Sequence, residues 1–166
     1  MTYVVLTNGI DRALVIGLTC PFSNEAPEKV LHKAPFHEKY YFKSRSENAP
    51  HIYSIGDIAY QNALHHVTPQ QIIFLGESAS GKTTNYLHLM EHLLFIGENP
   101  SICCDRIKNA VKLIHSLIHA STPSNDYSTR AILKTCISYG KTGKFSAATF
   151  KVHGLEKWRV SSRDTY

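Results

Sequence analysis

The chain has 166 residues, 43% of them hydrophobic and 19% charged, which is typical of a folded globular protein and excludes a disordered one. The net charge of +5 comes from scattered lysines and arginines, so it favours a solvated surface over a DNA-binding patch. No apolar run reaches the ~18 residues of a membrane span, and the first residues do not resemble a signal peptide. The cysteines form no C-x-x-C pair, so we expect a cytosolic protein with reduced thiols, several of them buried: Cys20, Cys103, Cys104 and Cys136.

The N-terminal third predicts two short strands, an irregular stretch and a helix. Apolar runs at residues 3–6 and 13–19 are typical of strands, whereas residues 20–50 contain four prolines among polar residues. After Pro50, apolar residues recur at helical spacing at Ile52, Ile55, Ala59 and Ala63.

The middle of the chain predicts a strand, a glycine-rich loop and two helices. An apolar strand at residues 72–75 leads into the loop, and the helix after Lys82 is expected to end at Gly97. The next helix has Asp105 as its candidate N-cap. Its apolar face would be formed by Ile107, Ala110, Val111, Ile114, Leu117 and Ile118.

The C-terminal third predicts a polar turn region followed by a β-hairpin. The segment "STPSNDYSTR" is rich in turn-forming residues. The two β-like runs that follow, residues 131–139 and 145–152, are joined by "GKTGK", whose glycines suit a hairpin loop.

The loop "GESASGKT", Gly76 to Thr83, fits the phosphate-binding pattern G-x-x-x-x-G-K-[ST] at every fixed position. Its N–H groups would meet phosphate oxygens at a helix N-terminus, and Gly76 and Gly81 allow the necessary backbone angles. Lys82 would reach the β- and γ-phosphates, and Thr83 would bind Mg²⁺ through its hydroxyl. The alternative is an ordinary glycine-rich turn.

The helix after the loop also contains "HLMEH", which matches the zinc-peptidase signature H-x-x-E-H. His88 and His92 would share the metal, with Glu91 as general base and Glu156 as a distant third ligand. The helical pattern favours a different interpretation, in which these residues form a solvated face opposite the apolar side formed by Tyr86, Leu89, Met90, Leu93 and Leu94. Surface positions are likewise expected for His65, His66, His115 and His119.

Three further segments stand in order around the loop: "APHIYSIGDIAYQ" before it, "SNDYSTR" and "LEKWRV" after it. Myosin motor domains have approximately PHIFAIADxAY, GESGAGKT, NDNSSR and LLEKSRV in the same order and spacing. From "ALVIGLTCPF" to Val160, the chain resembles the N-terminal part of such a motor domain. It is most similar to class III myosins of the insect photoreceptor kind, because it has "GESASGKTTN" and "YGKTGK".

The resemblance implies an α/β fold, a P-loop NTPase-type mixed β-sheet flanked by helices, with the phosphate-loop strand central. Residues 1–166 would form part of a myosin head, in which residues 1–50 lead to the nucleotide site. Residues 51–100 would comprise a helix, the P-loop strand, the P-loop and the following helix. Residues 101–130 would comprise a helix and switch I, and residues 131–160 a transducer-like hairpin.

The implied ligand is Mg-ATP. Ser128 would position the attacking water and, with Lys82, would be catalytic, while Thr129 would join Thr83 on the metal. Arg130 would form a salt bridge to a glutamate of switch II. The nucleotide would be bound by Gly76, Glu77, Ser78, Ala79, Ser80, Gly81, Lys82, Thr83, Asn125 and Ser128. Without the resemblance, "SNDYSTR" is only a polar loop.

Departures from the family pattern predict a slow or altered ATPase. Ala79 replaces a glycine, which costs about 1 kcal/mol if its φ is positive. Cys20 replaces an asparagine near the adenine, and Tyr127 replaces the central asparagine of switch I. The family's FGK after Arg130 is replaced by Ala131, Ile132 and Leu133.

The implied function is that of the ATP-binding portion of a cytoplasmic, actin-based motor at the actin cytoskeleton. Actin, and a light chain or calmodulin, would bind parts of the parent that are mostly absent here, and neither DNA nor a membrane is an expected partner. Switch II lies outside the chain, so we expect little turnover from it alone, and incomplete packing would make it poorly soluble. The alternatives are a degenerate, non-catalytic nucleotide-binding or scaffold module, a zinc hydrolase using His88, Glu91 and His92, and a small P-loop kinase.

Overall fold

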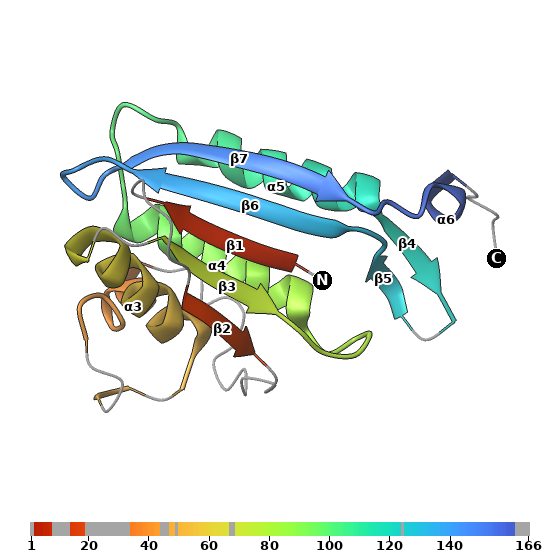
Figure 1. Cartoon of the computed structure of the whole chain (residues 1–166), viewed down its shortest axis with the longest axis horizontal. Helices are drawn as coiled ribbons and strands as arrows, with labels where there is room; N and C mark the ends of the chain where they lie inside the picture. The colour runs from red at the N-terminus through yellow and green to blue at the C-terminus, as the bar shows by residue number, and fades with distance from the viewer. Residues whose placement is uncertain are drawn as a thin grey trace.

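A five-stranded mixed sheet forms the centre of the computed structural model, with strand order β2-β3-β1-β6-β7 (Figure 1). β2 is parallel to β3 and β1 is parallel to β6, whereas β1 is antiparallel to β3 and β6 to β7. The strands are β1 (Thr2–Thr7), β2 (Leu14–Leu18), β3 (Gln70–Phe74), β6 (Ile132–Tyr139) and β7 (Phe145–His153).

The structure describes most of the chain. The described residues are 2–7, 14–18, 34–43, 47–48, 50–66, 69–123 and 125–161. Cys20, named above for its expected place near the adenine, lies outside them.

The phosphate-loop strand β3 is an interior strand, because β2 and β1 pair with its two edges. It is not the middle strand, however, since β1 occupies that position among the five described strands. The sequence expectation of a central strand is therefore correct only in that β3 has a neighbour on each side. The expected mixed sheet is present, as are all five expected strands.

Three longer helices accompany the sheet, and Figure 1 shows α4 and α5 behind it. Helix α3 begins where the side chain of His51 accepts a hydrogen bond from the backbone N–H of Tyr53, at 3.3 Å. Two short helices, α2 and α6, fall in stretches for which the sequence predicted none. The helices are α2 (Ala34–Glu38), α3 (Ile52–His65), α4 (Lys82–Ile96), α5 (Cys104–Ile118) and α6 (Lys157–Ser161).

Helix α4 is buried on both sides, which corrects the expected solvated face. His88 and His92 are only 3% and 0% exposed, and Glu91 is half-buried. The ring of His92 stacks on that of Tyr53 from α3, with ring centroids 4.4 Å apart, and its Nδ1 lies 3.1 Å from that of His37 in α2. His92 is thus buried among aromatic rings, because α2 and α3 pack against α4.

Helix α5 is covered on one side only. Val111 and Ile118 are buried, but Leu117, expected in the apolar face, is 57% exposed. The N-cap position is Cys103, so Asp105 lies in the first turn instead, where its carboxylate is 3.8 Å from the Lys108 ammonium. Of the other expected surface histidines, His65 and His66 are exposed, whereas His115 and His119 are half-buried.

The described cysteines are free thiols, as expected, but they are less buried than expected. Cys103 is exposed, and Cys104 and Cys136 are half-buried.

The polar segment after α5 forms a second, two-stranded sheet instead of an irregular turn. β4 (His119–Thr122) pairs antiparallel with β5 (Asn125–Thr129), and the pair extends beyond the end of the main sheet (Figure 1). The hydroxyl of Thr122 donates to the carbonyl of Asn125, at 2.9 Å, which closes the hairpin. This hairpin contains every residue that the sequence assigned to switch I except Arg130, which follows it directly.

Candidate functional site

The loop between β3 and α4 has the backbone conformation of a tight, glycine-dependent turn. Gly76 and Gly81 have φ values of 147° and 78°, a region in which glycine meets no Cβ penalty. Ala79 has a φ of 63°, so the position that carries alanine in place of glycine does require the left-handed conformation. The loop therefore retains its left-handed geometry with one strained residue in it.

Lys82, the first residue of α4, folds back over this loop. Its ammonium donates to the carbonyl of Gly76 at 2.8 Å, to the carbonyl of Glu77, and to the hydroxyl of Ser80 at 3.2 Å. Partial burial lowers the pKa of Lys82, and the nearby carboxylate of Glu77 opposes that shift. The lysine head is thus positioned by three acceptors of the loop itself.

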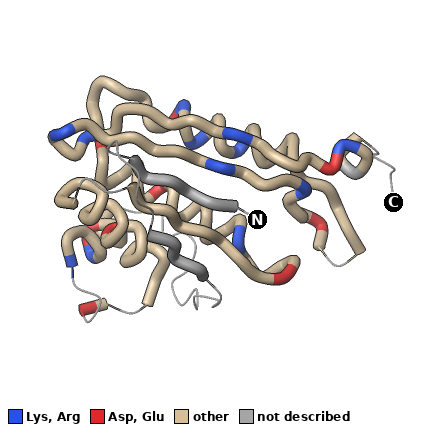
Figure 2. The backbone as a smooth tube through the Cα atoms, in the orientation of Figure 1, with Lys and Arg blue, Asp and Glu red and all other residues tan. Residues whose placement is uncertain are grey.

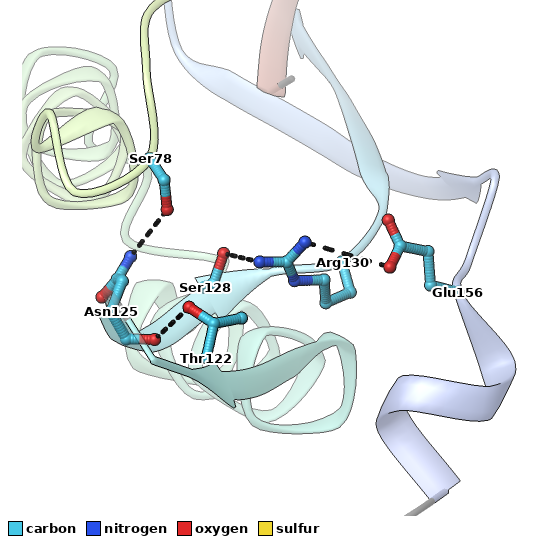
Figure 3. A network of polar contacts seen from close by, with 6 residues as sticks. All are labelled: Ser78, Thr122, Asn125, Ser128, Arg130 and Glu156. Atoms are coloured by element: carbon cyan, nitrogen blue, oxygen red, sulfur yellow. Dashed lines mark hydrogen bonds and ion pairs between the residues drawn. The ribbon is translucent and has the colours of Figure 1, made fainter.

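The β4–β5 hairpin lies against the loop, although some forty residues separate them along the chain. The hydroxyls of Thr83 and Thr129 are 3.1 Å apart. The side-chain amide of Asn125 is 3.5 Å from the hydroxyl of Ser78 (Figure 3). The structure therefore brings together the residues that the two sequence motifs assigned to one site.

A cavity of about 580 Å³ lies between loop and hairpin. Its described lining includes two cationic side chains, Lys82 and Arg130, six hydroxyl side chains besides that of Tyr127, and no carboxylate. Such a lining favours an anionic ligand with many acceptor oxygens. The lining residues are Ser78, Ala79, Ser80, Gly81, Lys82, Thr83, Thr84, Asn125, Tyr127, Ser128, Thr129 and Arg130.

In the part of the chain that the structure describes, the other Lys and Arg positions are distributed over several elements (Figure 2). The cavity is thus characterised by the residues that line it.

Mg²⁺ is the metal implied by the motifs, and two hydroxyls of the cavity are candidate ligands for it. Hydroxyl oxygens are the hard ligands that this ion accepts, and two cis ligands at about 2.1 Å from an octahedral ion are ~3 Å apart. The 3.1 Å separation of the Thr83 and Thr129 hydroxyls fits that requirement. The residues present are therefore compatible with Mg²⁺.

Arg130, at the end of the hairpin, connects the cavity to a residue whose role the sequence did not reveal. Its Nη2 donates to the hydroxyl of Ser128 at 2.6 Å, and its Nη1 lies 3.9 Å from the carboxylate of Glu156 (Figure 3). Sequence analysis expected Glu156 as a distant zinc ligand. No pattern in the sequence indicated its contact with Arg130, since 26 positions separate the two.

The zinc motif is not assembled as a metal site. No group of three or more histidine, cysteine, aspartate or glutamate side chains in the described part of the chain is arranged to hold a metal ion. Burial, reinforced by the charges of His37 and His51, holds the pKa of His92 well below its usual value. The two histidines of "HLMEH" are therefore buried packing groups in the described structure, which gives the zinc hydrolase alternative no support.

Within the described ranges, we find no helix with the length and apolar character needed to cross a membrane.

Comparison with known proteins places the chain in a family. The family model described as myosin head (motor domain) matches residues 16–165. Over 142 residues the chain is 50% identical to "Neither inactivation nor afterpotential protein C" of Drosophila melanogaster, a match that covers 86% of this chain and 9% of that protein. The likeness to class III myosins expected from the sequence is thereby confirmed. Matched by the family model over nearly its whole length, the chain belongs to the myosin head (motor domain) family.

Proposed function

We propose that this chain is the ATP-binding portion of an actin-based motor, with Mg-ATP bound between the β3–α4 loop and the β4–β5 hairpin. The observation that carries the proposal is the contact between loop and hairpin, in which Thr83 and Thr129 meet at a cationic, hydroxyl-rich cavity. Strand, loop and helix in a mixed sheet are also the context expected of a P-loop NTPase-type fold.

Each site residue has a role in this proposal. The backbone of Gly76 to Thr83 would bind the phosphates, with Lys82 reaching the β- and γ-phosphates and Asn125 contacting them from the hairpin. Thr83 and Thr129 would hold Mg²⁺, which when bound would neutralise phosphate charge. Ser128 would direct the attacking water, and Arg130 would pair with a switch II carboxylate of the whole motor.

The segments keep the roles assigned from the sequence. Residues 1–50 would lead to the site, residues 51–100 would carry the P-loop, residues 101–130 would end in switch I, and residues 131–160 would form the transducer-like hairpin. Because the match covers 9% of the Drosophila relative, hydrolysis coupled to force on actin is proposed for a whole motor at the actin cytoskeleton, of which this segment is one part.

A titration with a fluorescent ATP analogue tests the proposal. We expect saturable binding that Mg²⁺ strengthens and that Lys82→Ala abolishes, because the substitution removes the ammonium from the loop. Lys157→Ala, which removes an exposed lysine outside the cavity, is the matched control and should bind as the parent does. Binding that Lys82→Ala leaves intact would refute the proposed site.

A second candidate function is a degenerate nucleotide-binding or scaffold module. The strained φ of 63° at Ala79 favours it, since the strain works against a stable loop. In that case a folded sample would bind the analogue weakly or not at all, with or without Mg²⁺.

A further inference from the structure

Glu156 occupies the turn between β7 and α6 and is tied to Arg130 twice. Its backbone N–H donates to the Arg130 carbonyl at 2.9 Å, and its carboxylate lies 3.9 Å from the Arg130 guanidinium (Figure 3). The side chains are 40% and 19% exposed, respectively, so the ion pair is only partly shielded from solvent. The turn after the last strand is therefore in direct contact with the end of the β4–β5 hairpin.

Arg130 is held at its backbone and at the end of its side chain. Its backbone N–H donates to the carbonyl of Ile118 at the end of α5, at 2.8 Å, while its own carbonyl accepts from Glu156. Its guanidinium bridges two acceptors, the Glu156 carboxylate and the Ser128 hydroxyl. Because the guanidinium is a planar fork of donors, contact with the carboxylate on one side orients the donors on the other side.

The orientation of the Arg130 guanidinium determines which hydrogen bonds Ser128 can make. Ser128 is 7% exposed and lines the cavity. A hydroxyl carries one donor proton and two acceptor lone pairs. Since Arg130 donates to the Ser128 oxygen at 2.6 Å, that contact uses an acceptor position and leaves the O–H proton to be donated elsewhere. Phosphate oxygens only accept, so the arrangement prepares Ser128 to donate to a bound phosphate.

We propose that Glu156 is a positioning residue of the nucleotide site, which acts through Arg130 to present the Ser128 hydroxyl as a donor to the terminal phosphate of a nucleoside triphosphate. The inference rests on the proposed function, because it assumes that the cavity binds such a ligand. Nothing in this role requires Glu156 to touch the nucleotide.

The test uses Glu156→Gln, which keeps the size of the side chain and removes its charge. Partly exposed ion pairs contribute modestly, so we expect triphosphate affinity to fall about two- to fivefold. Affinity for the nucleoside diphosphate should stay within about twofold of that of the parent chain. The reason is that Ser128 would donate only to the terminal phosphate of the triphosphate, which the diphosphate lacks. The loss of triphosphate affinity caused by Glu156→Gln should also be smaller in high salt, because salt screens the ion pair. Glu98→Gln, an exposed glutamate at the opposite end of α4, is the matched control and should leave both affinities unchanged.

A double-mutant cycle separates positioning from a general loss of structure. If Glu156 acts through Arg130, then Arg130→Gln should lower triphosphate affinity, and Glu156→Gln should cause no further loss in that background. Unchanged or increased triphosphate affinity in Glu156→Gln, equal loss for both nucleotides, or additive losses in the cycle would each overturn the inference.

The two proposals fail in different ways. A parent chain that does not bind the triphosphate overturns both, whereas Lys82-dependent binding that Glu156→Gln leaves unaltered overturns only the inference. Thermal melting checks that each variant is folded. If Glu156→Gln does not fold, Glu156→Asp is used instead, since it keeps the charge but moves it away from Arg130. A fall in triphosphate affinity that is smaller than the one expected for Glu156→Gln supports the inference, and an unchanged triphosphate affinity overturns it.

Discussion

The hydroxyls of Thr83, in the first turn of α4, and Thr129, at the end of β5, lie 3.1 Å apart. This contact joins the two halves of the candidate site, which come from segments 46 residues apart. Either hydroxyl can be the donor, so the pair forms a hydrogen bond that a metal ion ligated by both oxygens would replace.

Replacing either threonine by valine should remove the Mg²⁺ dependence of nucleotide binding. Valine keeps the branched shape and loses the hydroxyl, so the loop and hairpin should still form while one metal ligand is missing. We expect the ratio of affinities with and without Mg²⁺ to approach one in Thr83→Val and Thr129→Val. Titration of a fluorescent ATP analogue measures it, and Thr149→Val, an exposed threonine on β7, is the control. A ratio equal to that of the parent would show that these hydroxyls do not bind the metal.

Ala79→Gly should strengthen both the fold and the phosphate loop. The φ of 63° costs alanine roughly 1–2 kcal/mol, and glycine avoids that strain while adding up to about 1 kcal/mol of unfolded-state entropy. The expected net gain is therefore between zero and about 2 kcal/mol, or up to ~4–8 °C in Tm. Ala63→Gly, at a buried position within α3, provides the contrast and should lower Tm. A lower Tm for Ala79→Gly would mean that the loop relaxes away from this conformation in solution.

Much of the fold follows from local patterns. The strands at residues 70–74, 132–139 and 145–153 and the helix at residues 52–65 have continuous or periodic apolar residues, and each lies within a few positions of its expected place. At position 79 the sequence predicted a left-handed backbone only as a condition, based on the glycine that the family pattern has there, and the structure shows that φ to be 63°.

The remaining features depend on contacts between distant segments. The β4–β5 strands are polar because they lie at the cavity and beyond the main sheet, so they lack the apolar signal of a strand. His88 and His92 look solvated in a helical projection, since one sequence cannot show that α2 and α3 pack against α4. The contact of Glu156 with Arg130 likewise requires the register between β6 and β7, which places the two residues at the same end of the sheet.

Two glycines should respond differently to alanine substitution. A Cβ on Gly97 would lie 2.4 Å from Cε1 of Tyr139, whose ring is buried and whose hydroxyl donates to the Leu93 carbonyl at 3.1 Å. Because that ring cannot move freely, Gly97→Ala should cost about 1–3 kcal/mol. A Cβ on Gly56 would meet Cδ1 of Leu89 at 2.7 Å, the mobile end of a side chain, and alanine gains up to ~1 kcal/mol of helix propensity there. Urea denaturation should therefore show the larger loss for Gly97→Ala, and equal losses would contradict the rigid-ring explanation.

The outward side of α5 should limit solubility. Leu113 and Leu117 are one helical turn apart and are 61% and 57% exposed, so they present adjacent apolar surface to solvent. The double variant Leu113→Gln/Leu117→Gln should reduce self-association in sedimentation experiments while changing stability by less than about 0.5 kcal/mol per site. Val111→Gln, at a buried position on the same helix, should instead unfold the protein. Self-association that is unchanged in the double variant would assign it to another surface, such as the edge of β7.

The buried aromatic and histidine cluster should make stability depend on pH. His51 is 6% exposed, and burial, followed by the charges of His88 and His37, lowers its pKa from 6.5 to about 4. Between pH 6.5 and 4 the unfolded chain therefore binds a proton at this position that the folded chain does not. The stability associated with neutral His51 is complete above pH 6.5 and is lost as the pH falls towards 4, by up to ~1.4 kcal/mol per pH unit.

His51→Asn isolates this contribution. Asparagine does not titrate, yet it can still accept the hydrogen bond from the backbone N–H of Tyr53 that begins α3, so the cap is preserved. We expect urea midpoints measured at pH 7.5 and 5 to differ less in this variant than in the parent. His92, whose pKa burial also lowers, should account for part of the remaining dependence. If His51→Asn and the parent lose stability in parallel, His51 is already protonated or solvated in the folded state, and the packing of α2 and α3 against α4 is looser than the buried cluster implies.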